Sequence, residues 1–225
     1  MIINKIPCSI IMIAGLIALP FVPASAQEAR ISREVTKLAA QGLEQALIMV
    51  ERAADPGLLG FDSKDELPRA QLGTPISVRT LGYDALLAHQ PGARLDTLVS
   101  GPDRIVVPVT VDEETRSWIN VVDSGQGWTV SGFGDTKNAQ MTAKLTRPLA
   151  DKRPEILHAP AFNLYAVGFT EGDQMLFVPI GPSTVPDLEP ETPIPVDELL
   201  AKLANYAREL DAEYGDQIRA RRIVH

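Results

Sequence analysis

The stretch Ile105-Val-Val-Pro-Val-Thr-Val111 decides the fold that we expect. Its isoleucine and valines recur at every second position, which is the spacing of side chains on one face of a β-strand. The polar segment Asp112-Glu-Glu-Thr115 then indicates a tight turn, and Arg116–Val122 is again rich in strand-forming residues. The glycines around Gln126 lead into Trp128–Phe133. We therefore predict three strands in an antiparallel meander whose apolar face belongs to the core.

Three further segments predict strands before and after this meander. Ile76–Leu81 follows the turn residues Gly73-Thr-Pro75. Phe162–Phe169 and Gln174–Ile180 lie on either side of Glu171-Gly-Asp173, which is typical of a hairpin turn. With the meander, these segments predict an antiparallel sheet of about six strands.

A short similarity within the chain raises the question of an internal duplication. Val106-Val-Pro-Val109 in the meander resembles Phe177-Val-Pro-Ile180 in the second hairpin. The flanking residues do not repeat, and matches of this length between apolar strands are common by chance. Duplication and chance similarity both stay open at this point.

Helical periodicity marks two long segments and one short one. Apolar residues recur at intervals of three or four from Glu28 to Ala53, and Asp55-Pro-Gly57 ends that pattern. A second pattern runs from Pro195 to Ile218, and a shorter one covers Lys137–Leu145. Pro182–Pro195 contains five prolines and no periodicity, which is typical of an extended surface connector.

These elements predict the α+β class, with a single domain at residues 27–225. Long amphipathic helices lie at its N-terminal and C-terminal ends, and the helices pack mostly on one side of the antiparallel sheet. We expect residues 55–103 and 182–194 to cover the second face, because both segments are long and contain apolar side chains. The alternative is an open groove for a peptide, a lipid-like ligand or a second subunit.

Aromatic residues in the strands are the candidates for a binding site on that second face. In several strands, large apolar side chains point to both faces of the predicted sheet. We interpret these residues first as core, and as the leading ligand contacts if a ligand exists, because amphipathic aromatics supply contact area at low entropic cost. They are Trp118, Trp128, Phe133 and Tyr165.

The first 26 residues have the layout of a secretory signal peptide. Lys5 precedes the apolar run Ile10–Leu19, which is too short to span a bilayer, and Ala24-Ser-Ala26 supplies small residues for cleavage before Gln27. Cleavage removes Cys8, the only cysteine, so we expect neither a disulfide nor lipid attachment in the mature protein. An uncleaved anchor is the alternative interpretation.

Charge and location limit the partners of the mature protein. The chain carries a formal net charge of −8, which becomes about −9 when Lys5 is removed. An acidic chain repels phosphate backbones, so we exclude nucleic acid as a partner. The signal peptide indicates export, and the absence of an N-glycosylation sequon gives no support to a glycosylated eukaryotic route. We therefore favour the periplasm or the secreted fraction of a Gram-negative bacterium.

Residues for catalysis or metal binding are few. The three histidines, His89, His158 and His225, are far apart and lack metal-ligand spacing, so we expect no metal and no cofactor. Gly132-Phe-Gly-Asp135 lacks the glycine pattern of a phosphate loop. We assign the remaining acidic pairs to solvated turns or a solvated helix face. They are Asp112-Glu-Glu114, Glu171-Gly-Asp173 and Glu209-Leu-Asp211.

The segment Trp118–Gly134 resembles a known kind of module. It consists of a strand, then Gly-x-Gly-Trp, then Thr-Val-Ser-Gly-Phe-Gly. This arrangement is similar to strand pairs in uncharacterised exported bacterial proteins and in cystatin-like or PepSY-type modules. The similarity covers less than a third of the chain. The resemblance implies a curved antiparallel sheet around a long helix, and in some members protease inhibition or propeptide-like regulation. No Gln-Val-Val-x-Gly inhibitory loop is present, so the resemblance bears on architecture more than on activity.

These observations predict an exported non-catalytic binding or interaction module of the bacterial envelope. Its partner would be an envelope protein or an apolar ligand. Two alternatives stay open: a secreted hydrolase that uses carboxylates, and a structural homodimer that buries the spare sheet face. A deep polar pocket with two acidic groups would favour hydrolysis, and a dry apolar groove would favour ligand binding.

Overall fold

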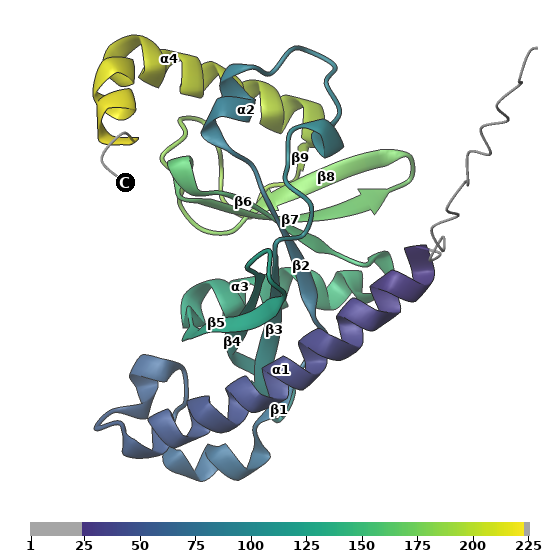
Figure 1. Cartoon of the computed structure of the whole chain (residues 1–225), viewed down its shortest axis with the longest axis vertical. Helices are drawn as coiled ribbons and strands as arrows, with labels where there is room; N and C mark the ends of the chain where they lie inside the picture. Colours follow the sequence, from purple (N-terminus) through teal and green to yellow (C-terminus); the bar gives the residue numbers. More distant parts are fainter. Residues whose placement is uncertain (1–23, 223–225) are drawn as a thin grey trace, which may run out of the picture.

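The computed structural model describes residues 24–222, and at its centre lies a mixed, mostly antiparallel sheet of nine strands (Figure 1). Most of the predicted signal peptide, including Cys8, lies outside the described residues, and so does His225. None of the described helices has both the length and the apolar character that a membrane crossing needs. The elements are α1 (Ala24–Arg52), η1 (Pro56–Leu59), η2 (Lys64–Arg69), β1 (Gln71–Leu72), β2 (Ile76–Thr80), α2 (Tyr83–Leu87), η3 (Leu95–Thr97), β3 (Arg104–Val111), β4 (Glu114–Asp123), β5 (Trp128–Gly134), α3 (Thr136–Thr146), η4 (Arg147–Lys152), β6 (Glu155–Ala159), η5 (Pro160–Phe162), β7 (Leu164–Glu171), β8 (Gln174–Pro179), β9 (Ile194–Pro195) and α4 (Val196–Arg222).

The sheet consists of two units that meet at a parallel pair of strands. The strand order is β5-β4-β3-β2-β6-β7-β8-β9, with β1 paired to β3. Only the central pair, β2 and β6, is parallel, and the other pairs among the described strands are antiparallel. Each unit starts at the centre, proceeds outward strand by strand and ends in a helix. The first unit is β2-β3-β4-β5-α3, and the second is β6-β7-β8-β9-α4.

The hairpin turns of the two units occupy equivalent positions. The β3–β4 turn is Asp112-Glu113, with φ of 50° and 68°, and the β7–β8 turn is Gly172-Asp173, with φ of 59° at Gly172. This equivalence pairs β3 with β7 and β4 with β8. The sequence similarity between Val106–Val109 and Phe177–Ile180 links β3 with β8 instead. That similarity therefore does not correspond to the repeat in the fold.

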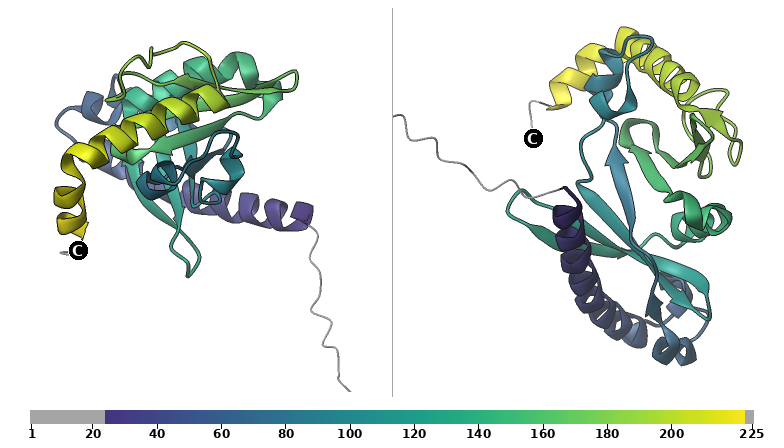
Figure 2. Two further views of the ribbon diagram at one scale, coloured as in Figure 1. Left: turned by 90° about the horizontal axis from the view of Figure 1, so that it is seen from above. Right: turned by 90° about the vertical axis from the view of Figure 1, so that its right-hand side faces the viewer.

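Helices α1 and α3 cover opposite faces of the first unit (Figure 2). Ile105 and Val107 of β3 belong to the same core cluster as Val35 of α1. Val106, between them, packs with Ala139 of α3. The alternation of side chains along β3 thus supplies a core on each side of the sheet.

Helix α4 lies on the α1 side of the sheet, according to the strand register. Ser77 is paired with Ile105, and Arg79, two residues later on β2, is paired with Leu157 of β6. Paired residues share a face, so Leu157 lies on the same face as Ile105. Leu157 packs with Leu203 of α4. Helices α1 and α4 therefore share one side of the sheet, whereas α3 covers the other side, which was not expected.

The segments expected to cover the second face pack elsewhere. Phe61 joins the core beneath α1, and Leu86 and Leu95 join the core beneath α4. Val185 and Leu188 of the proline-rich connector also join the core beneath α4. The expected cover by residues 55–103 and 182–194 is therefore wrong, because their apolar side chains complete the two cores that α1 and α4 begin.

The predicted number of about six strands is also wrong, because β1, β6 and β9 were not expected. Strands β1 and β9 have two residues each, too few for an alternating pattern. Strand β6 lies between Pro154 and Pro160 and is buried on both faces at Ile156 and Leu157, so it has no alternation. The first helix also differs from its predicted bounds, since α1 begins at Ala24 and ends at Arg52.

A buried ion pair attaches the segment after α1 to the sheet. The side chains of Arg116 on β4 and Glu66 on η2 are 13% and 7% exposed. Arg116 Nη2 lies 2.5 Å from Glu66 Oε1 and 2.9 Å from Asp62 Oδ2. The Asp62 backbone N–H donates to Glu66 Oε2 at 2.9 Å. Without Glu66, the mostly buried guanidinium of Arg116 keeps only two exposed partners, Asp62 and Glu114, whose side chains are 77% and 68% exposed.

Replacing Glu66 tests how much this ion pair contributes to the free energy of unfolding. We expect Glu66→Ala to lower the free energy of unfolding by about 3 kcal/mol, because Arg116 loses its buried partner. Arg69→Ala is the control: it breaks a pair with Asp112 whose side chains are 51% and 62% exposed, and it should cost less than about 1 kcal/mol. Urea denaturation of both variants measures the difference, and equal losses would contradict the assignment.

Candidate ligand-binding site

The four aromatic residues singled out by the sequence do not form one site. Trp118 and Tyr165 lie on the α3 side of the sheet, with ring centroids 6.4 Å apart. Trp128 and Phe133 pack with the core beneath α1, on the opposite side. Trp118 is 2% exposed and the other three are partly buried. All four therefore contribute to cores, and Trp118 also lines a cavity.

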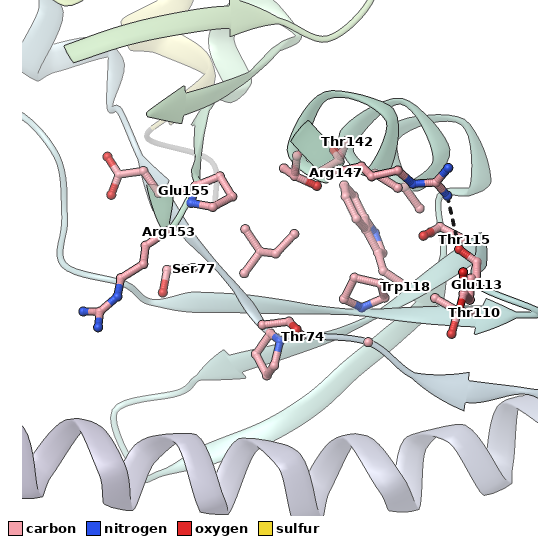
Figure 3. Close-up of a pocket in the computed structure, with 18 residues that line it drawn as sticks. Thr74, Ser77, Thr110, Glu113, Thr115, Trp118, Thr142, Arg147, Arg153 and Glu155 are labelled. Carbon is pink, nitrogen blue, oxygen red and sulfur yellow. Dashed lines mark hydrogen bonds between the residues drawn. The ribbon is translucent and has the colours of Figure 1, made fainter. Parts of the chain in front are cut away.

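A cavity of about 580 Å³, here called the α3 cavity, lies between α3 and the sheet (Figure 3). Its floor is formed by β2, β3 and β4, and its roof by α3. Its ends are the β3–β4 hairpin and the segment that leads into β6. This volume is within the range of small-molecule sites. The lining includes Ile76, Pro108, Trp118, Ala139, Thr142 and Ala143.

Small side chains on α3 leave this space open. Ala139, Thr142 and Ala143 are the residues of its central turns that line the cavity. The corresponding helix of the second unit, α4, instead buries three leucines against its side of the sheet. They are Leu199, Leu200 and Leu203. The α4 side is therefore filled where the α3 side is hollow.

Three buried polar atoms of the cavity lining make no hydrogen bond among the described residues, and one of them, Glu155 Oε1, is in an ion pair with Arg79. The indole Nε1 of Trp118 and the Oγ1 of Thr142 make no hydrogen bond, although these residues are only 2% and 1% exposed. A buried polar group left without a partner costs about 1–3 kcal/mol, so protein, water or ligand normally satisfies it. All three residues line the α3 cavity.

Charged groups lie at the two ends of the α3 cavity. Arg147, directly after α3, donates from Nη2 to the backbone carbonyl oxygen of Glu113 at 3.3 Å. At the other end, Glu155 Oε1 lies 3.5 Å from Arg79 Nη1. Burial raises the pKa of Glu155, and Arg79 opposes this effect. Among the described residues, Arg147 and Arg153 have no carboxylate within ion-pair distance.

His158 belongs to a separate polar cluster on the same face. It is paired with Tyr165 across β6 and β7, and the two rings stack with centroids 4.2 Å apart. The guanidinium of Arg104 lies 5.6 Å from the centre of the Tyr165 ring. Burial first, and then the charge of Arg104, lowers the pKa of His158 to about 4, while Asp103 and Asp135 act in the opposite direction.

The remaining candidate residues are scattered over the molecule. His89 lines a small cavity of about 180 Å³ beside α4, far along the chain from His158. The part of the chain that the structure describes contains no group of three His, Cys, Asp or Glu side chains placed to hold a metal ion. The acidic residues of the two hairpin turns are exposed. They are Asp112, Glu113, Glu114, Glu171 and Asp173.

Sequence reasoning missed Thr142, Ala143 and Arg147. The helix that carries the first two was expected, but a threonine on an amphipathic helix is usually structural. The available signal was the row of small residues at Ala139, Thr142 and Ala143, which share one helix face at intervals of three and four. Such a row indicates close packing or a space, and only the position of α3 decides between them.

Comparison of the chain with protein-family models, with curated proteins and with solved structures finds no match. The similarity of Trp118–Gly134 to cystatin-like and PepSY-type modules therefore stays a prediction. Functional proposals rest on the α3 cavity and on the residues that line it.

Replacing His158 should change how stability depends on pH. The native pKa of about 4 lies below the ordinary value of 6.5, so the unfolded state binds the proton more tightly. The contribution of neutral His158 is complete above about pH 6.5 and is lost as the pH falls toward 4. His158→Phe keeps a ring against Tyr165 but cannot be protonated.

Between about pH 7 and 4.5, we expect the original protein to lose about 1–2 kcal/mol more stability than the His158→Phe variant, allowing for partial exposure of the imidazole. Urea unfolding across this pH range measures the two curves. Parallel curves would contradict the lowered pKa.

Proposed function

We propose that this chain is an exported, non-catalytic binding module of the bacterial envelope and that the α3 cavity is its binding site. The observation that carries the proposal is the pair of buried polar groups, Trp118 Nε1 and Thr142 Oγ1, without partners beside a cavity of about 580 Å³. Export rests on the signal peptide predicted for residues 1–26.

The chemistry of the lining supports a role in binding. Ligand sites are mostly apolar, with a few placed polar groups that fix orientation. The α3 cavity combines alkyl and proline surfaces, such as Ile76 and Pro108, with the indole N–H of Trp118 and the hydroxyl of Thr142. These groups recognise a molecule through contact and hydrogen bonds.

The arrangement of the carboxyl groups favours binding over hydrolysis. Glu113 and Glu155 both line the α3 cavity, but they lie at opposite ends of it (Figure 3). Glu155 is also in an ion pair with Arg79. Hydrolysis by two carboxyl groups requires both of them beside one bond.

Filling the α3 cavity tests whether it is the binding site. Ala143→Leu places a larger side chain in the lining, and Gln140→Leu places the same side chain on the exposed face of the same helix. A ligand at about 100 times its Kd stabilises a protein by about 2.7 kcal/mol. In a thermal-shift screen of small organic molecules, we expect the original protein and Gln140→Leu to be stabilised and Ala143→Leu not to respond. Equal shifts in all three proteins would place binding elsewhere.

Fractionation of a Gram-negative host that expresses the full chain tests export. We expect the mature protein in the periplasmic or secreted fraction, with Gln27 as its first residue by N-terminal sequencing, because Ala24-Ser-Ala26 has the small residues of a cleavage site. A chain that keeps Met1 and stays with the cytoplasmic fraction would contradict the proposal.

A further inference from the structure

We propose that the ligand of the α3 cavity is a small organic anion, with a carboxylate carried on an apolar body. This inference rests on the proposed function, since it names the ligand class for that same site. Three properties of the lining support it: the hydrogen-bond donors at one end, the balance of charge at the ends, and the apolar part of its surface.

The donors at the hairpin end require an acceptor. In Figure 3, Trp118, Thr142 and Arg147 lie toward the end of the cavity formed by the β3–β4 hairpin. An indole N–H can only donate, so the partner of Trp118 Nε1 must be an acceptor, and the hydroxyl of Thr142 can also donate. Arg147 has five N–H donors, and Glu113 accepts one of its hydrogen bonds. A carboxylate, with two acceptor oxygens, matches this set of donors.

The charges around the α3 cavity favour an anion. In a chain with a formal net charge of −8, Arg147 and Arg153 lack ion-pair partners among the residues that the structure covers. Of the two carboxyl groups in the lining, Glu155 is paired with Arg79. Glu113 is exposed, as are Arg147 and Arg153, and it contacts Arg147 through its backbone oxygen. The ends of the cavity therefore offer more uncompensated positive charge than negative charge.

Part of the lining of the α3 cavity suits a hydrocarbon. Ile76 and Pro108 on the sheet and Ala139 and Ala143 on α3 belong to the lining, and none of these side chains has a polar atom. Burial of a ligand methylene against such a surface contributes about 0.8 kcal/mol in general. A ligand that is polar throughout would leave its groups without partners there. The lining thus selects an amphipathic molecule with its charge at one end.

Fluorescence of Trp118 reports on occupation of the cavity. The chain has two tryptophans, and Trp128 packs on the opposite side of the sheet, so Trp128→Phe leaves Trp118 as the single reporter. We would titrate this variant with octanoate, octylammonium and 1-octanol, which share one hydrocarbon body and differ in charge. We expect octanoate to change the emission of Trp118 saturably, with an affinity at least about tenfold higher than that of the other two probes.

Variants of Arg147 and Thr142 test how much each donor contributes to the affinity for octanoate. In the Trp128→Phe background, Arg147→Gln should weaken octanoate roughly tenfold and leave 1-octanol unchanged, as expected for loss of a charge-assisted hydrogen bond. Thr142→Val keeps the side-chain volume, removes the hydroxyl and should weaken octanoate severalfold. Lys137→Gln is the control, because it removes a positive charge from the exposed part of the same helix, outside the lining.

The outcomes distinguish this inference from the proposed function. If octylammonium or 1-octanol binds as tightly as octanoate, or if Arg147→Gln binds octanoate normally, the anion is the wrong ligand class although the cavity binds ligands. If no probe changes the emission of Trp118, the inference is overturned as well. The thermal-shift screen with Ala143→Leu then decides independently whether the α3 cavity binds any small molecule.

Discussion

The parallel pairing of β2 with β6 is the constraint on which both units of the sheet depend. It consists of Val78 with Ile156, Arg79 with Leu157 and Thr80 with His158. Neighbouring strands share the alternation of faces, so this register decides which side chains of the second unit face α3 and which face α4. A shift by one residue would exchange Ile156 and Leu157 between the two sides and disrupt both cores at once.

The position of α3 follows from this junction and explains why a space remains beneath it. Helix α3 ends the first unit, yet it contacts both β4 of that unit and β7 of the next. It therefore lies over the region where the two units meet, and its inward residues, Ala139, Thr142 and Ala143, are small. Helix α4 covers strands of its own unit and buries leucines against them. The space beneath α4 is therefore a filled core, whereas the equivalent space beneath α3 is a cavity.

The sequence predicts the elements whose periodicity is strong and misses those whose environment is unusual. The segments of β2, β3, β4, β5, β7 and β8 show strand patterns, but β6 is buried on both faces between Pro154 and Pro160 and has no alternation to detect. Periodicity shows which face of a helix is apolar, not which layer the helix covers, so α3 was not expected on the second face. Trp118 could be singled out by its residue type. Thr142 and Arg147 could not be predicted as cavity residues, because only the position of α3 places them there.

The attachment of α3 links the cavity to stability. Polar contacts hold its C-terminal end: Lys144 Nζ lies 2.7 Å from Glu191 Oε2, and Arg147 donates to the Glu113 carbonyl. Nearer its N-terminal end, Ala139 is the residue of α3 that is buried in the core cluster with Trp118. The α1 and α4 clusters are larger and contain no residue of α3, so α3 contributes less apolar burial than either long helix. Elements with little apolar burial open at the lowest free-energy cost. A molecule that fills the α3 cavity adds apolar contacts and hydrogen-bond partners for Trp118 and Thr142, so its binding stabilises the docked position of α3 while the two larger cores stay unchanged.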